Sequence, residues 1–219
     1  MKRRDFSNGL LGTCTLGAMG TLGAAQAQAQ AGAPIEGTHY VRLGQPVATT
    51  APGKIEVMEF FWYGCPHCHA FEPTLNAWVR ALPADVAFRR VPVAFSKEPF
   101  VAHQRIFYAL ESTGQLAAMH AKVFSAIHND RQRLDQPAEI LAFMVKNGVD
   151  AAQFSTAYDS FSVQAKVSQA TQLAAAYKID GVPALGVNGR YYTSGSLAGS
   201  NQSALTVVDF LVGRLRKTV

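Results

Sequence analysis

Two cysteines that lie two residues apart, Cys65 and Cys68, directly follow an apolar segment that ends at Gly64. That segment, residues 55–62, is mostly apolar, which is typical of a strand in the middle of a sheet with helices on both faces. Pro66 has the position that proline favours in the first turn of a helix. The pattern therefore predicts an α/β fold in which a central strand leads into a helix that starts with both cysteines.

This placement allows the two cysteines to form a disulfide and makes them chemically unequal. Residues three apart on a helix lie about 5 to 6 Å apart, within the Cα range of a disulfide. We expect Cys65 to be the exposed nucleophile, because unpaired backbone N–H groups and the positive end of the helix dipole lower the pKa of its thiol. His67 would stabilise the thiolate further. Cys68, one turn further in, is expected to be buried and protonated.

The first residues are typical of an export signal. Lys2, Arg3 and Arg4 precede a stretch of small and apolar residues, and the run of alternating Ala and Gln at residues 25–31 offers A-x-A cleavage sites. We therefore expect residues 1–31 to be removed and the mature protein to be periplasmic. The adjacent arginines fit a twin-arginine signal as well as the general export route, and both remain open. Cys14 lies in this segment and should be removed with it.

The mature chain would keep only two cysteines in an oxidising compartment, where a single C-x-x-C is more typical of a redox centre than of a structural staple. The signal carries a net +2 of the formal +5, so the mature chain keeps about +3, and it has no basic run interleaved with aromatic residues. We therefore do not expect nucleic acid as a partner. No other apolar segment approaches the about 20 residues that span a bilayer, so we expect a soluble monomer.

The first helix is expected to run from about Cys65 to Leu82, with a kink at Pro73. Residues 86–93 predict a second strand. Pro92 indicates that this strand either ends there or lies near an edge of the sheet. Residues 98–177 then have the periodicity of amphipathic helices, which indicates an inserted helical subdomain.

The last part of the chain predicts a hairpin and a helix. Asn188-Gly189 is a strong hairpin signal between strands at residues 184–187 and 190–193. Ser200 can cap a helix that reaches residues 216–217, where basic side chains suit the negative end of the helix dipole.

Several motifs occur in a characteristic order, namely E-F-F at residues 59–61, C-P-H-C at residues 65–68, and G-V-P-A at residues 181–184 followed by V-N-G at residues 187–189. In this order and spacing they resemble the DsbA family of periplasmic thiol:disulfide oxidoreductases, over essentially the whole mature chain. The resemblance implies a thioredoxin-like α/β fold with an inserted all-helical subdomain. Residues 32–97 and 166–219 would form the thioredoxin-like domain and residues 98–165 the insertion.

The resemblance also implies a function. The protein would be a thiol:disulfide oxidase that donates a Cys65–Cys68 disulfide to newly exported, unfolded proteins with free thiols, and a quinone-linked membrane protein similar to DsbB would reoxidise it. Pro66 and His67 would tune the redox potential. Val182-Pro183 would form a cis-proline loop beside the dithiol, where the neighbouring backbone pairs with an extended client. No cofactor and no metal would be needed.

Glu59 is a further candidate for the site. It shares strand parity with apolar neighbours, so we expect it to point into an otherwise apolar face, although a solvated acid near an edge is the alternative. In the resembling family an acid at this position lies beneath the second cysteine, where a raised pKa allows it to relay a proton. Glu72 is interpreted as a solvated helix acid.

The remaining aromatic and histidine residues are given no part in the redox chemistry. Phe61 is expected in the core, with Trp62 or Tyr63 at the rim of a peptide groove. The other histidines lack the spacing of metal ligands and are expected at the surface or as caps, namely His39, His103, His120 and His128.

Two alternative functions remain. The first is a dithiol reductase or isomerase of the same fold, although no dimerisation domain precedes the dithiol. The second is a metal-binding module that uses Cys65, His67, Cys68 and His69, since thiolates and imidazoles bind zinc and copper. Four ligands within five residues of one helix cannot converge on a tetrahedral ion, which disfavours the metal module.

Overall fold

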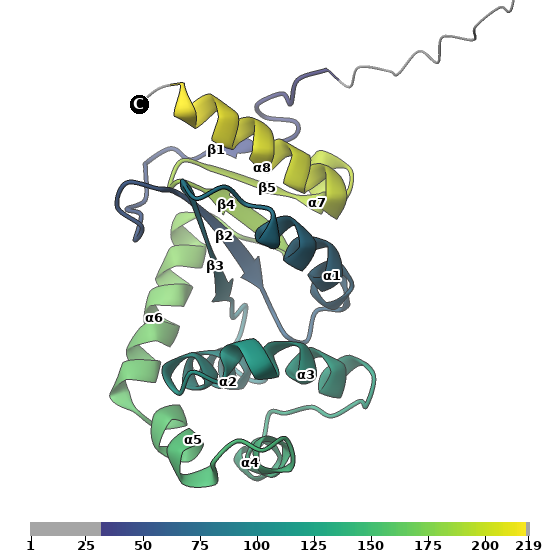
Figure 1. Ribbon diagram of the computed structural model, residues 1–219, viewed down its shortest axis with the longest axis vertical. Coiled ribbons are helices and arrows are strands. Elements are labelled where there is room, and N and C mark those ends of the chain that lie inside the picture. Colours follow the sequence, from purple (N-terminus) through teal and green to yellow (C-terminus); the bar gives the residue numbers. More distant parts are fainter. Residues whose placement is uncertain (1–31, 218–219) are drawn as a thin grey trace, which may run out of the picture. The chain divides into compact units, whose positions relative to one another are not determined.

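The computed structural model describes residues 32–217, so the expected export signal lies outside the described residues. Five strands form one mixed sheet in the order β1-β5-β4-β2-β3 (Figure 1). The strands are β1 Val41–Arg42, β2 Ile55–Phe61, β3 Val86–Pro92, β4 Ala184–Val187 and β5 Tyr191–Ser194.

β2 is the buried strand that the apolar segment before the cysteines predicts. All of its residues are buried, and it pairs with β3 in parallel and with β4 in antiparallel orientation. β3 is an edge strand and ends at Pro92, as the proline predicted. In the β2–β3 register Glu59 lies opposite Arg90. This pairing places an acidic and a basic residue next to each other on the buried strand and its edge neighbour.

Eight helices accompany the sheet within the described residues. They are α1 Pro66–Arg80, α2 Phe100–Ser112, α3 Leu116–His128, α4 Pro137–Lys146, α5 Ala151–Tyr158, α6 Phe161–Ala176, α7 Gly195–Ala198 and α8 Asn201–Arg216. α1 begins directly after Cys65 and contains Pro73, although the kink at Pro73 stays a prediction. Ser200 caps α8 as predicted, because its side chain accepts a hydrogen bond from the Ser203 backbone N–H.

The two faces of the sheet contribute to different apolar clusters. Val57 and Leu185 pack with Leu75 of α1 and Leu211 of α8, and these two helices contact each other (Figure 1). Phe60 belongs to a second cluster that continues into the helices between β3 and β4. The cysteines at the start of α1 are part of this second cluster, so the dithiol lies where the sheet meets the helical region.

Helices α2 to α6 lie between β3 and β4 in the chain, which is the helical insertion that the sequence predicts. In Figure 1, α2 to α5 gather beyond one end of the sheet and α6 runs back along it. The boundaries of this subdomain stay a prediction, and the one placed at residue 165 falls inside the continuous helix α6. None of the helices formed by residues 32–217 has the length and apolar character that crossing a membrane requires.

The hairpin forms at Asn188-Gly189, and both residues have the positive φ that the turn requires. Its second strand starts one residue later than predicted, because Arg190 lies in the loop and Val187 pairs with Tyr191. The sequence reading missed β1, a two-residue strand that pairs with β5 at the sheet edge. So short an element has no periodicity to detect.

Candidate active site

The two cysteines are free thiols at the N-terminus of α1. Cys65 is the N-cap residue, and its Sγ accepts a hydrogen bond from the Cys68 backbone N–H at 3.4 Å. Pro66 starts the helix, where its missing N–H leaves no donor unpaired. The strand, the glycine and the proline therefore place Cys65 Sγ at the positive end of the helix, as the sequence predicts.

The two thiols differ strongly in their ionisation. A hydrogen bond from the Cys68 side chain, backbone N–H groups and the charge of His67 outweigh desolvation and lower the pKa of Cys65 to about 6. Burial and the hydrogen bond to Cys65 raise the pKa of Cys68 far above its usual value. Cys65 is 7% exposed, so it is less open than the exposed nucleophile that we expected, while Cys68 is fully buried.

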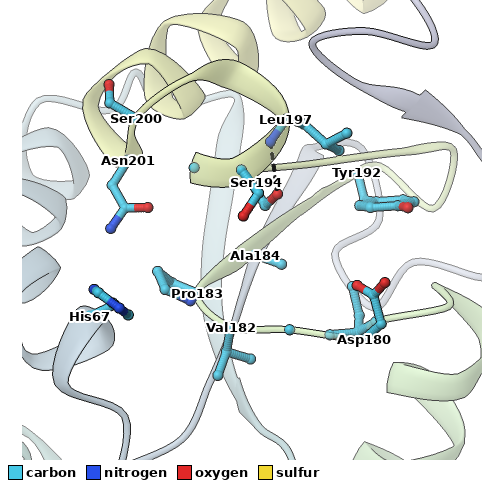
Figure 2. A pocket seen from close by; sticks show the side chains of 14 residues that line it. His67, Asp180, Val182, Pro183, Ala184, Tyr192, Ser194, Leu197, Ser200 and Asn201 are labelled. Carbon is cyan, nitrogen blue, oxygen red and sulfur yellow. Dashed lines mark hydrogen bonds between the residues drawn. The ribbon is translucent and has the colours of Figure 1, made fainter.

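The Val182-Pro183 loop lies beside Cys65. Its peptide bond is cis, as the resemblance implied, and the Cys65 thiol donates a hydrogen bond to the Val182 carbonyl at 3.4 Å. The loop borders a cavity of about 660 Å³ that extends from His67 past Pro183 to residues 194–201. Figure 2 shows His67 on one side of Pro183, with the side chain of Asn201 above it. A ligand in this cavity would contact the same loop whose Val182 carbonyl accepts the hydrogen bond from Cys65.

Glu59 points into the protein interior as expected and is fully buried. Arg90 donates to its Oε2 at 3.0 Å, while its Oε1 has no hydrogen-bond partner among the described residues. Burial and the nearby Glu72 carboxylate raise the pKa of Glu59 to about 8. Glu59 and Cys68 also influence each other electrostatically, since Glu59 contributes to the raised pKa of Cys68. At neutral pH Glu59 is therefore mostly a protonated acid close to the dithiol.

The interpretation of Glu72 as a solvated acid is wrong, because its residue is only 6% exposed. Arg90 donates to both of its carboxylate oxygens, at 3.1 and 3.2 Å, and Asn76 donates at 3.0 Å. Although burial opposes ionisation, hydrogen bonds from His120 and Asn76 and the charge of Arg90 outweigh it and lower the pKa of Glu72. Arg90 therefore stabilises the ionised form of Glu72 more than that of Glu59, and Glu59 keeps its proton.

His120 extends this network to α3 and is not the surface residue that we expected. It is 7% exposed, and burial lowers its pKa, so it is neutral near pH 7. Its Nε2 lies 3.4 Å from the Glu72 carboxylate, and its Nδ1 lies 2.8 Å from the Tyr63 hydroxyl. We assign the proton to Nε2, which faces the carboxylate, so that Tyr63 donates to Nδ1. Tyr63 is fully buried, which excludes it from the rim.

The other histidines have different roles. His103 is buried, against expectation, and donates to the Arg133 carbonyl at 2.9 Å. His128 donates to the Tyr63 carbonyl at 2.8 Å and stacks on His69 with ring centroids 4.8 Å apart. His39 accepts from the Ile35 N–H in an exposed turn, as expected.

Among the aromatic residues before the cysteines, Phe61 is in the core as predicted and Trp62 is partly exposed. The Trp62 indole stacks on Phe100 at a centroid distance of 4.2 Å. It also occupies the space where a side chain at position 64 would project, which explains Gly64. Trp62 is therefore the residue at the rim of the site.

Sequence analysis missed the buried network around Arg90, although two signals for it existed. Glu72 follows Cys68 by four residues and precedes Leu75 by three, so it belongs to the inward stripe of α1. Arg90 interrupts an otherwise strand-like segment opposite Glu59. His120 carried no such signal, because its position depends on how α3 packs. Among residues 32–217 no cluster of three or more His, Cys, Asp or Glu side chains is arranged to hold a metal.

The family model that describes the DSBA-like thioredoxin domain matches residues 56–206, which include the dithiol, the helical insertion and the cis-proline loop. The chain belongs to the DsbA family. It is 41% identical to the thiol:disulfide interchange protein DsbA of Azotobacter vinelandii over 98% of both chains. It is 44% identical to that of Bordetella pertussis, over 95% of this chain and 96% of the relative.

The solved structures of DsbA proteins agree with this assignment. The crystal structure of DsbA from Pseudomonas aeruginosa matches with a TM-score of 0.81 and 42% identity, over 84% of this chain and 96% of that one. DsbA from Xylella fastidiosa matches with a TM-score of 0.77 and 32% identity, over 84% of this chain and 98% of that one. These matches confirm the thioredoxin-like fold with a helical insertion, and this DsbA-family chain is a thiol:disulfide oxidoreductase.

Proposed function

We propose that this chain is a thiol:disulfide oxidase that donates a Cys65–Cys68 disulfide to newly exported, unfolded proteins. The difference between the two thiols carries the proposal. A thiolate with a pKa of about 6 is a good leaving group at neutral pH and stabilises the reduced protein. A protein whose reduced form is stabilised is an oxidant for thiols with ordinary pKa values.

In the first step a client thiolate attacks Cys65 Sγ of the disulfide. A mixed disulfide forms between the client and Cys65, and Cys68 leaves as a thiolate. A second client thiolate then attacks the client sulfur of the mixed disulfide and expels Cys65. The client gains one disulfide and loses two electrons, and the protein becomes the dithiol seen in the structure. Pro66 and His67 tune the balance, because the His67 backbone N–H and ring charge stabilise the Cys65 thiolate.

Glu59 supplies the proton for Cys68 in this proposal. A buried Cys68 thiolate is costly, which its strongly raised pKa expresses. Glu59, with a pKa of about 8, is mostly protonated at pH 7, and its Oε1 makes no hydrogen bond within the described residues. Proton transfer from Glu59 to the departing Cys68 would neutralise the thiol without exposing it to water. In the reverse direction Glu59 would accept the proton.

Clients would bind along the Val182-Pro183 loop. The Val182 carbonyl lies 3.4 Å from Cys65 Sγ, so a polypeptide whose cysteine reaches this sulfur passes over the loop. Backbone pairing with an extended client depends little on side chains, which suits a broad range of unfolded proteins. Pro183 would form the wall of the site on the client side, because it lacks an N–H and is buried.

We further propose that the mature protein works in the periplasm after residues 1–31 are removed, and that a quinone-linked membrane protein similar to DsbB reoxidises it. The basic and apolar leader and the A-x-A sites support export. The need for reoxidation follows from the chemistry, because each client disulfide leaves one reduced protein.

The test is the equilibrium of the Cys65–Cys68 disulfide with glutathione, with thiols trapped by a mass tag. We expect the protein to become reduced in weakly reducing mixtures. His67→Ala should need a more strongly reducing mixture to become half reduced. A disulfide that persists in strongly reducing buffer would contradict the oxidase and favour a reductase of the same fold. Cys68→Ser, which cannot form the disulfide, controls for the trapping.

A further inference from the structure

The cavity beside Cys65 has walls from two separate segments. One wall is the cis-proline loop, from Ile179 to Ala184, and the other is formed by residues 192–201 of β5, α7 and the start of α8. Figure 2 shows Pro183 and Val182 at the dithiol end, near His67, and Asp180 and Tyr192 further along. A client bound to Cys65 that continues along this loop must place side chains in the cavity.

The lining is polar, with one carboxylate. Hydroxyl and amide groups come from residues 192–201, and Asp180 supplies the only formal negative charge of the lining, which contains no Lys or Arg. The Asp180 side chain is exposed and makes no hydrogen bond or ion pair with any residue of the described chain. An unpaired carboxylate in a concave wall attracts a cation that enters the cavity, because no Lys or Arg of the lining cancels its field and His67 lies at the other end of the cavity (Figure 2).

The spacing along the loop defines which client residue meets this carboxylate. Asp180 precedes Val182 by two residues, across bends at residues 181–183, so the two lie at most about 7 Å apart along the backbone. In an extended client, the residue two positions from the cysteine lies the same distance away and shares its face. A long side chain on that residue can therefore reach Asp180 when the client cysteine lies beside Val182. The cavity of about 660 Å³ has room for a long side chain, whose alkyl stem can pack on Tyr192 and Ile179.

We propose that this cavity selects client segments with Lys or Arg two residues from the reacting cysteine, and that Asp180 is the specificity-determining residue. The inference rests on the proposed function, since it concerns the substrates of that same site. It adds a preference to a site that otherwise recognises backbone. A pair between exposed charges changes a rate or affinity by about two- to fivefold and is screened by salt.

The experiment uses peptides with a single cysteine that differ only in the residue two positions from it. That residue is Lys, Leu or Glu. The cysteine carries a thionitrobenzoate group in a disulfide. The Cys65 thiolate of the reduced full-length protein attacks the peptide sulfur, a Cys65–peptide disulfide forms, and thionitrobenzoate leaves as a coloured thiolate. The rate reports on the cavity whichever way the protein moves disulfides in its natural reaction, so failure of the oxidase proposal remains a separate result.

We expect the Lys peptide to react about two- to fivefold faster than the Leu peptide, and the Glu peptide to react more slowly still. Asp180→Asn should make the three peptides react at similar rates, and Asp180→Lys should make the Glu peptide the fastest. In the unmodified protein, 0.5 M salt should reduce the differences among the three rates. Asp130→Asn, which removes an exposed carboxylate outside the cavity lining, should leave the order of the three rates unchanged. Equal rates for the three peptides, or a Lys preference that survives Asp180→Asn, would overturn the proposal.

Discussion

Two carboxyl groups share one arginine beneath the dithiol, and this arrangement explains why Glu59 and Glu72 ionise differently. Arg90 makes two hydrogen bonds to Glu72 and one to Glu59. Only Glu72 also has Asn76 and His120 beside it. Like charges in one buried site cannot both be stabilised, so Glu72, which has more hydrogen-bond partners, ionises and Glu59 keeps its proton.

The first prediction concerns Glu59→Gln. Cys68 resolves a mixed disulfide only after losing its proton, and in the unmodified protein the Glu59 carboxylate accepts it, so the rate should rise with pH up to about 8. The variant should resolve roughly tenfold to a hundredfold more slowly at pH 8 and lose this pH dependence. The resolution rate is measured by stopped flow, as the loss of a mixed disulfide on Cys65.

Glu56→Gln is the matched control for this variant. Glu56 is a buried carboxyl on the same strand, but it binds Thr50 and Arg89. Its removal should leave the resolution rate of Cys68 unchanged. If Glu59→Gln resolves with the unmodified rate and pH profile, Glu59 is not the proton relay.

Glu59 also makes folding depend on pH. Its folded-state pKa of about 8 lies above the ordinary value of 4.5, so the folded protein binds more protons than the unfolded chain between those two values. Stability contributed by this group is therefore lost as pH rises from about 5 to 8, by an amount on the order of a few kcal/mol. Glu59→Gln should lack this loss when urea unfolding is measured across that range.

At the scale of elements, α3 is linked by hydrogen bonds to Tyr63, in the loop between β2 and α1. Tyr63 contacts α3 twice, since its hydroxyl donates to His120 and its carbonyl accepts from His128. His120 in turn approaches Glu72 on α1. The helical insertion is thus connected by hydrogen bonds to the segment that positions Cys65, and this connection explains why His120 is buried.

Replacing His120 should weaken this attachment. His120→Phe leaves the buried Tyr63 hydroxyl without its partner, which costs about 1–3 kcal/mol of unfolding free energy. Adding Tyr63→Phe removes the unpaired hydroxyl as well and should recover part of the loss. Denaturant unfolding of the two single variants and the double variant measures the coupling. Strictly additive losses would mean that the hydrogen bond contributes nothing.

The hairpin gives an independent prediction about an element. Gly189 has φ +65°, and its carbonyl accepts a hydrogen bond from the Val47 N–H. A Cβ at this position would overlap the Val47 carbonyl. Gly189→Ala should destabilise the protein by about 2 kcal/mol or more. Gly199→Ala, at φ +89° with open space around it, isolates the conformational cost and should lose only about 1 kcal/mol. Equal losses in thermal unfolding would contradict the clash.

At the scale of the whole molecule, the redox state and the stability of the fold are linked through Cys65. Its folded-state pKa of about 6 lies below the ordinary value of 9.0. The reduced protein therefore gains stability as pH rises from about 6 to 9 and loses it as pH falls through 6. The oxidised protein has no thiolate and lacks this contribution.

This linkage predicts a pH-dependent gap between the melting temperatures of the two forms. From pH 5.5 to pH 8 the Cys65 thiolate should add about 2 kcal/mol to the reduced form alone. The melting temperature of the reduced form minus that of the oxidised form should therefore increase by roughly 4–8 °C. Calorimetry with and without reductant measures it, and reduced Cys65→Ser should lack this gain. A constant gap would show that the thiolate is not stabilised by the fold.

The sequence by itself determined the elements whose signals are local. The apolar run before Gly64, Pro66 and the C-P-H-C spacing predicted a buried strand, the start of α1 and two unequal thiols. Asn188-Gly189 predicted the hairpin and Ser200 the last cap. These signals depend on backbone conformation within a few residues, which the side chains in that window control.

Only the tertiary structure decided which polar groups are buried together. Arg90 reaches Glu59 because β2 and β3 pair in one register, and His120 reaches Tyr63 because α3 packs over the start of α1. It also decided that Asp180 and residues 192–201, from separate segments, line one cavity. Contacts of this kind depend on the packing of distant segments, and burial then changes the ionisation of each group, so the local sequence determines neither effect.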